Sequence, residues 1–157
     1  MTVADTGQRQ GFHAQSNVYL PHIAVVEKIV DETYDTKTFH LNFKDEKLRQ
    51  DFTFESGQFA FCSIFGVGEA PFAISSSPTR KDHLELAVRQ VGRLTRALHR
   101  LGVGAEVGFR GPYGNSFPLD QLQGKNLVFV AGGIGLSPLR SLIWNVIDLS
   151  LIHISEP

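Results

Sequence analysis

The sequence has little cysteine and little net charge, and these shortages limit the kinds of site that it can build. Its 157 residues contain one cysteine, Cys62, which excludes an internal disulfide and an iron–sulfur or zinc site made from the chain's own thiolates. We interpret Cys62 as a small buried apolar residue. The formal net charge is −1, with acidic and basic residues interspersed, so nothing favours binding to nucleic acid or to a membrane surface.

Long apolar runs are also missing from the sequence. No run approaches the roughly 20 residues that are needed to span a bilayer, so we expect no membrane insertion. The polar segment 1–17 has no apolar signal core, which predicts a flexible leader and, by default, a reducing cytoplasmic location. The composition, with 42% hydrophobic and 20% charged residues, is that of an ordinary globular protein.

What the chain does contain is a series of short β-like segments with one helical segment among them. Alternating or β-branched stretches predict six strands, and apolar residues at helical spacing predict a helix between the fifth and sixth strands. The predicted strands are Ile23–Val30, Lys37–Phe43, Gln58–Ile64, Phe72–Ser76, Leu84–Val88 and Glu106–Arg110, and the predicted helix is Gly92–Leu101. We interpret Lys44–Asp51 as a charged loop and Gly111–Gly124 as a connector. This pattern favours a mainly β fold, a small closed antiparallel barrel.

A different pattern begins after the connector. The apolar run Leu127–Ala131 predicts a buried parallel strand, and it leads into the turn Gly132–Gly135 and a helix at Ser137–Ile147. In that helix Ser137 is predicted as the N-cap and Pro138 as the first helical residue. Glycines in such a turn let a pyrophosphate or nicotinamide approach the backbone, and the helix N-terminus adds free N–H groups. A tight turn without a ligand is the alternative interpretation.

Two earlier features are also candidates for ligand contact. The tetrapeptide Gly92–Thr95 opens the predicted helix, where free N–H groups, the Thr95 hydroxyl and Arg93 could hold a phosphate. A plain amphipathic helix with solvated arginines explains the same residues equally well. The stretch Phe72–Pro78 (FAISSSP) places an aromatic ring beside hydroxyl groups, as a site for a flat ring requires, although an ordinary strand with a buried phenylalanine has the same pattern.

The order of these three features resembles the ferredoxin–NADP reductase superfamily. The resemblance implies a six-stranded Greek-key flavin-binding barrel followed by an incomplete α/β (Rossmann-like) nucleotide-binding domain. The family's Arg-x-Tyr-Ser motif aligns with Ala70–Ala73, so Phe72 takes the aromatic position against the isoalloxazine, while alanines replace the arginine and the serine. Gly92–Thr95 resembles the family's second phosphate motif, and Ala131–Pro138 resembles its nicotinamide motif. The residues that the resemblance assigns to cofactor contact are Phe72, Ala73, Ile74, Ser75, Ser76, Gly92, Arg93, Leu94, Thr95, Gly132, Gly133 and Gly135.

The two sequence stretches GEAPFAISSSP and VRQVGRLTRAL resemble electron-transfer subunits within this superfamily most closely. These are the gamma subunits of sulfhydrogenases and Ni–Fe hydrogenases, an electron-transfer subunit of anaerobic sulfite reductase and, more distantly, the dihydroorotate dehydrogenase electron-transfer subunit. The resemblance implies a flavin-dependent oxidoreductase that passes electrons from NAD(P)H through FAD, or FMN, to an iron–sulfur partner within a redox complex. No catalytic side chain is expected, since the cofactors carry the chemistry. The alternative is a non-catalytic interaction subunit with a degenerate flavin site, which Ala70 and Ala73 suggest.

We expect four segments: the leader at 1–17, a flavin-binding barrel at 18–123, the start of an NAD(P)-binding domain at 124–148, and a tail at 149–157. The tail, LSLIHISEP, resembles the in-frame translation of a transposase sequencing adapter, which implies that the native sequence stops near Asp148. A genuine short apolar tail is the alternative. Only 33 residues follow Gly124, whereas a complete domain of this kind needs roughly 100. We therefore expect this chain not to react with NAD(P)H, and any iron–sulfur cluster to lie in a further C-terminal part or in a partner.

Overall fold

Six strands form one antiparallel sheet in the computed structural model, which describes residues 19–150. The strand order is β4-β3-β6-β1-β2-β5, so β6 returns to lie between β1 and β3, as in a Greek-key arrangement. The strands are β1 (His22–Asp31), β2 (Thr36–Phe43), β3 (Phe59–Ile64), β4 (Gly68–Ala73), β5 (Leu84–Arg89) and β6 (Glu106–Tyr113). Five of the predicted strands are confirmed, and the fourth is shifted: only Phe72 and Ala73 of the predicted Phe72–Ser76 belong to β4, because Ser75 and Ser76 bond to β5 instead of continuing the ladder with β3. The predicted leader 1–17 and the tail residues 151–157 lie outside the described residues.

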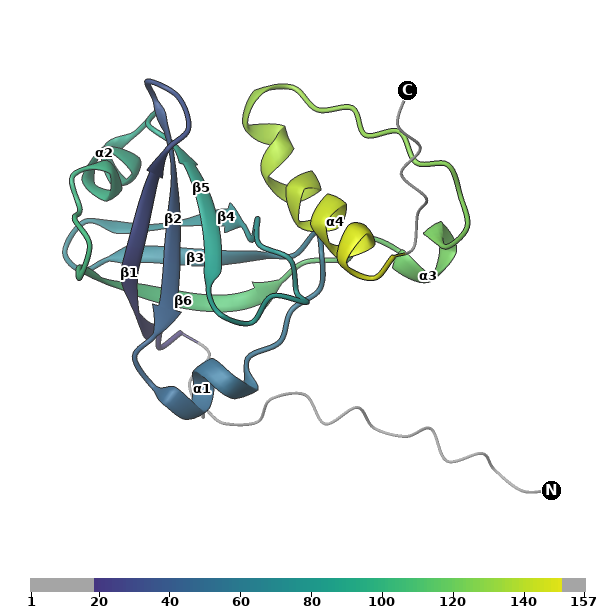
Figure 1. Cartoon of the computed structure of the whole chain (residues 1–157). Helices are drawn as coiled ribbons and strands as arrows, with labels where there is room; N and C mark the ends of the chain where they lie inside the picture. Colours follow the sequence, from purple (N-terminus) through teal and green to yellow (C-terminus); the bar gives the residue numbers. More distant parts are fainter. Residues whose placement is uncertain (1–18, 151–157) are drawn as a thin grey trace.

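The sheet curves like a barrel but does not close with a continuous ladder (Figure 1). Its edge strands β4 and β5 meet at a single bridge between Ile74 and Leu86, beside which the Ser75 N–H donates to the Glu85 carbonyl at 2.8 Å. The closed barrel that the sequence predicts is thus an open six-stranded sheet. Pro71 within β4 has no N–H to donate, which an edge strand tolerates and a closed ladder does not.

The core lies on the inner face of the curved sheet. Alternate residues of each strand point inward; in β2 these are Phe39, Leu41 and Phe43, all at most 2% exposed. Helix α2 (Arg93–His99) packs onto this core through Leu98 and confirms the predicted helix. Cys62 is 1% exposed, and burial raises the pKa of its thiol to about 12, so its predicted role as a buried apolar residue is confirmed.

A short helix, α1 (Glu46–Asp51), occupies the segment that the sequence predicts as a charged loop. The Asp45 side chain caps it by accepting from the Leu48 N–H at 3.0 Å, and Leu48 is buried. Lys47 and Asp51 form an ion pair at 2.6 Å across one turn. The loop prediction was wrong because one capping carboxylate and one buried leucine suffice to form a helical turn among charged residues.

From the end of β6 to residue 150, the structure shows helices and no strand. These are α3 (Leu119–Leu122), the 3₁₀ turn η1 (Gly133–Gly135) and α4 (Leu136–Asp148). The predicted strand Leu127–Ala131 has no regular secondary structure and pairs with no strand, and Val128 and Val130 are 87% and 84% exposed. That prediction was wrong for the described residues, because they provide no parallel neighbour for it. Within residues 19–150, no helix is long and apolar enough to cross a membrane.

Candidate functional site

The predicted aromatic motif lies at the end of the edge strand β4. Phe72 faces Ala60 of β3, is half-buried and packs against the core, and Ala73 faces Phe59. Ile74 is fully buried, and its N–H donates to the Gln58 carbonyl at 3.1 Å. Phe72 and Ala73 are thus the members of the motif that keep some exposure at the open edge of the sheet.

The two serines that follow are held by the neighbouring strand. Ser75 is fully buried, and its hydroxyl donates to the Glu85 carbonyl at 3.0 Å. The Ser76 hydroxyl accepts from the Glu85 N–H at 3.2 Å. Both hydroxyls therefore tie the end of β4 to β5 in this structure, and their contribution to a ligand site is to fix the course of the backbone.

The predicted phosphate motif forms the start of α2, with Gly92 as its N-cap. The Thr95 hydroxyl accepts from the N–H groups of Val91 and Gly92 at 2.9 and 2.8 Å, and it donates to the Gly92 carbonyl at 3.2 Å. Thr95 therefore shapes this turn from within, while Arg93 is exposed and Leu94 is half-buried against the core. Because Gly92 has no side chain, no capping group covers the first N–H groups of the helix.

The predicted nucleotide turn is exposed and open. Gly132, Gly133 and Gly135 are exposed, and a Cβ at any of them would meet nothing within 4 Å. Gly133 has φ +54°, a backbone conformation that favours glycine. The turn runs directly into α4, which begins at Leu136. Ser137 is therefore inside the first turn of α4 and is not the N-cap, so this prediction was wrong.

A cleft of about 390 Å³ lies between this turn and the sheet. Its volume falls in the range of small-molecule sites, roughly 300–1,000 Å³. Its walls are the β1–β2 turn, β5 and the start of α4, with lining residues that include Glu32, Asp35, Arg89, Gly133, Ser137 and Arg140. Of the predicted site residues the cleft contains Gly133 alone. Arg89, which lines the cleft, precedes Gly92 by three residues, so the cleft lies close in sequence to the turn at the start of α2.

Some polar groups of the cleft are paired with each other, and one has no hydrogen-bond partner among the described residues. The Asp35 carboxylate accepts from Arg89 at 2.7 Å, and this hydrogen bond lowers the pKa of Asp35. Ser137 is 7% exposed, and its Oγ has no hydrogen-bond partner among the described residues. A buried unsatisfied hydroxyl beside exposed glycine backbone and a helix N-terminus fits an anionic or polar ligand in this cleft.

Helix α4 packs beside the sheet and is held there by polar contacts that the sequence does not predict (Figure 1). Ser141 and the Asn145 amide both donate to the Ser56 hydroxyl, at 3.2 and 3.0 Å. At its end, Asp148 pairs with Arg80 at 2.8 Å, and the Arg80 guanidinium also lies 4.3 Å from the centre of the Trp144 ring. These contacts place the glycine turn against the sheet.

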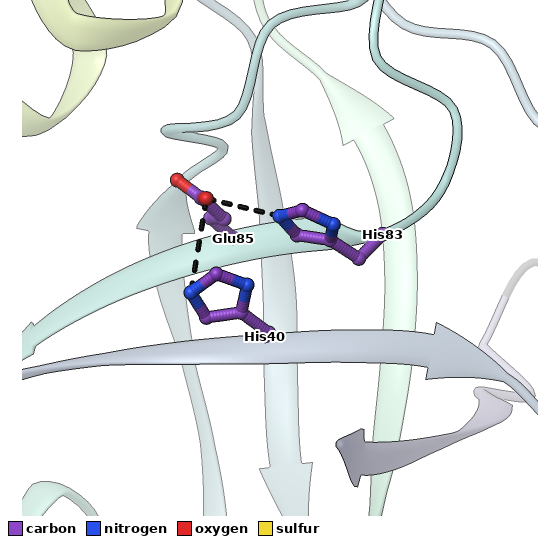
Figure 2. A group of neighbouring side chains, drawn as sticks. All are labelled: His40, His83 and Glu85. Carbon is purple, nitrogen blue, oxygen red and sulfur yellow. Dashed lines mark hydrogen bonds and ion pairs between the residues drawn. The ribbon is translucent and has the colours of Figure 1, made fainter. Parts of the chain in front are cut away.

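A cluster of His40, His83 and Glu85 lies on the outer face of β2 and β5, next to α4 (Figure 2). Burial is the largest cause that lowers the pKa of His40. Arg140 of α4 contacts the Glu85 carboxylate on one side and Glu32 on the other. The sequence motifs did not indicate this cluster; the signal available was the spacing His83-x-Glu85 at the start of a predicted strand, which favours two ligand-type side chains on the same side of the chain.

Comparison with known proteins gives the family. The model of the oxidoreductase FAD-binding domain matches residues 23–117. The gamma subunit of sulfhydrogenase 2 from Pyrococcus furiosus is 43% identical over 132 residues, which cover 84% of this chain and 46% of that protein. A probable dihydroorotate dehydrogenase B electron transfer subunit from Methanocaldococcus jannaschii is 37% identical, covering 78% of this chain and 42% of that protein.

Solved structures give the same fold. A ferredoxin–NADP+ reductase from Plasmodium falciparum matches with a TM-score of 0.70 at 18% identity, over 84% of this chain and 56% of that one. The chain spans about half the length of the curated relatives it matches. The chain has a six-stranded sheet of this topology, and residues 23–117 match the family model. It is therefore a member of the oxidoreductase FAD-binding domain family, with a ferredoxin reductase-like fold.

Proposed function

We propose that this chain is the flavin-binding, electron-transferring part of an NAD(P)H-dependent oxidoreductase. The observation that carries the proposal is the match of residues 23–117 to the FAD-binding domain family. It is supported by relatives that are named as a hydrogenase subunit and as an electron transfer subunit. Bound FAD supplies hydride acceptance from a nicotinamide and release of single electrons, and the protein's part is positioning and shielding.

The flavin is proposed to lie along the open edge of the sheet. Phe72 would flank the flat ring system there, and the small side chain of Ala73 leaves space beside it. Ile74, Ser75 and Ser76 would act through the backbone that they hold in place. The first turn of α2, which comprises Gly92, Arg93, Leu94 and Thr95, would bind the phosphates through N–H groups and the exposed guanidinium.

The nicotinamide nucleotide is proposed to bind at the glycine turn. Gly132, Gly133 and Gly135 present open backbone at the start of α4, beside the buried Ser137 hydroxyl. We propose that 124–148 begins a nucleotide-binding domain, in which the exposed Leu127–Val130 segment is paired with further strands. The acceptor is proposed to be an iron–sulfur subunit of the same complex, and the location is proposed to be cytoplasmic.

Single-turnover electron transfer tests this proposal. The 157-residue chain is loaded with FAD, reduced anaerobically with dithionite and mixed with an oxidised ferredoxin, and flavin reoxidation is followed by absorbance. The proposal predicts faster transfer from the bound flavin than from an equal concentration of reduced free FAD. A loaded chain that reacts no faster than free FAD would contradict it. A chain that binds no flavin would favour the non-catalytic interaction subunit that Ala70 and Ala73 suggest.

A further inference from the structure

The cluster of His40, His83 and Glu85 has the composition of a metal site, and the pairing of two strands brings it together. His40 of β2 and Glu85 of β5 are direct partners in the antiparallel ladder. His83 precedes Glu85 by two residues and therefore points to the same outer face. His40 and Glu85 are set opposite each other by strand pairing, and His83 lies in the segment that leads into β5, one residue before its start (Figure 2).

The ligand atoms lie at the separations that a shared metal ion requires. Glu85 Oε1 is 3.0 Å from His83 Nε2 and 3.8 Å from His40 Nε2, and all three ligand atoms lie within 4.8 Å of one another. Zinc binds nitrogen and oxygen at about 2.0–2.2 Å, which places tetrahedral ligands roughly 3.4 Å apart. The observed distances bracket that value, and the two imidazole rings stack with their centroids 4.4 Å apart.

The groups around the cluster orient the ligands as they do in known metal sites. Asp82 Oδ2 lies 2.7 Å from His83 Nδ1, which turns the opposite nitrogen, Nε2, toward Glu85. A carboxylate on the second nitrogen of a histidine ligand is the usual arrangement around protein-bound metals. Arg140 contacts the other carboxylate oxygen, Oε2, so Oε1 is left to the two histidines.

The cluster is also accessible from solvent. The side chains of His40, His83 and Glu85 are 14%, 21% and 12% exposed, so an ion can enter and a water molecule can complete its coordination. Two histidines, one glutamate and one water form a recurrent zinc ligand set. The mixed nitrogen and oxygen donors disfavour calcium and magnesium, which prefer oxygen alone.

We propose that His40, His83 and Glu85 bind a divalent transition-metal ion, zinc in particular, on the outer face of β2 and β5. None of the three ligands is a proposed flavin contact, although the backbone of Glu85 hydrogen-bonds to Ser75 and Ser76. Because Glu85 also contacts Arg140, a bound ion would hold in place the carboxylate that anchors α4 to the sheet.

Zinc titration of the chelator-treated 157-residue chain tests the proposal. Isothermal calorimetry with zinc chloride is expected to show one equivalent bound, with the affinity reduced at least tenfold in His40→Gln and in His83→Gln. The matched control is His22→Gln, on β1 and away from the cluster, which is expected to bind zinc as the parent chain does. Absence of stoichiometric binding, or equal affinity in all four proteins, would overturn the proposal.

A second measurement needs no variant and therefore does not depend on how the variants fold. The chain has six histidines, each of which gives imidazole signals in NMR spectra. Zinc is expected to shift the signals of His40 and His83 and to leave those of the other four in place. Shifts confined to other histidines would show that zinc binds elsewhere and would overturn the proposal.

Discussion

Ile74 belongs by sequence to the flavin-binding motif and by structure to the core. Its side chain is fully buried and its residue forms the one bridge that joins β4 to β5. Ser75, also fully buried, adds two hydrogen bonds to the Glu85 carbonyl beside that bridge. The middle of the motif thus holds the open edge of the sheet in place, and Phe72, which is only half-buried, is the residue proposed to contact the flavin.

Ile74→Ala is expected to act on stability. Removing the buried side chain leaves a cavity in a packed core, which costs about 2–5 kcal/mol of the free energy of unfolding. Urea denaturation of the variant and the parent chain measures this difference. Ile134→Ala, at a residue that is 44% exposed, is the matched control and is expected to change the free energy by about 0.5 kcal/mol or less. A stable Ile74→Ala variant would contradict the core role.

Asp148 ties the end of α4 to the sheet in a way that depends on pH. The hydrogen bond from Arg80 is the largest cause that lowers the pKa of Asp148 from 3.8 to about 2, and Thr79 adds to it. A lowered pKa means that the carboxylate stabilises the docked helix above its ordinary pKa. This stabilisation is lost as the pH falls from about 4 through about 2.

Trp144, the only tryptophan, reports on this contact because its ring lies under Arg80. Asp148→Asn is expected to lower the temperature at which Trp144 fluorescence changes at neutral pH. The difference from the parent chain should shrink as the pH falls from about 4 to about 2, where the parent loses the same charge. Asp120→Asn on α3 removes one carboxylate elsewhere as a control. A constant difference across that pH range would contradict the assignment.

A single side chain, that of Thr95, stabilises the turn at the start of α2. Thr95 accepts from two N–H groups that precede the helix and so fixes the turn on which the proposed phosphate contacts depend. Thr95→Val keeps the shape and removes the acceptor, which is expected to cost about 0.5–2 kcal/mol of stability, as loss of a helix cap does. Thr95→Ser is expected to restore it. Denaturant titrations of the three proteins measure the effect, and equal stability of Thr95→Val would contradict it.

In the unpaired segment Leu127–Val130, Val128 and Val130 are 87% and 84% exposed. Exposed β-prone backbone of this kind favours association between molecules. The double variant Val128→Lys/Val130→Lys is expected to reduce aggregation in light scattering, while the free energy of unfolding changes by about 0.5 kcal/mol or less per substitution. The paired control Val103→Lys, also at an exposed site, should leave aggregation as it is. Unchanged aggregation of the double variant would contradict this interpretation.

The elements that the sequence predicts correctly are those whose own residues stabilise them. Strands such as β3 and β5 bury alternate residues, and α2 has apolar residues at helical spacing, so local pattern and burial agree. Leu127–Ala131 has the pattern of a strand but lacks a partner, and α1 is a helix because of one capping residue, Asp45. The cluster of His40 and Glu85 depends on the register between two strands, and the sequence of either strand alone does not predict that register.

At the scale of the whole molecule, the sheet and α4 enclose a cleft between segments that are distant in sequence. The β1–β2 turn contributes Glu32 and Asp35, β5 contributes Arg89, and the segment around α4 contributes Gly133 and Ser137. The resemblance of the sequence to flavoprotein reductases predicted the class of protein, which the fold and family confirm, but it did not predict the residues that line this cleft. The docking contacts themselves, such as Asp148 with Arg80, join residues 68 positions apart and carry no local signal.

Equilibrium dialysis of the purified 157-residue chain against FAD measures whether the sheet binds the flavin. We expect about one FAD per chain, with a protein-bound flavin absorbance spectrum and weaker binding of riboflavin, which lacks the phosphates that Gly92–Thr95 would hold. If a chain whose circular dichroism shows the folded sheet retains no FAD, the proposed flavin site is wrong.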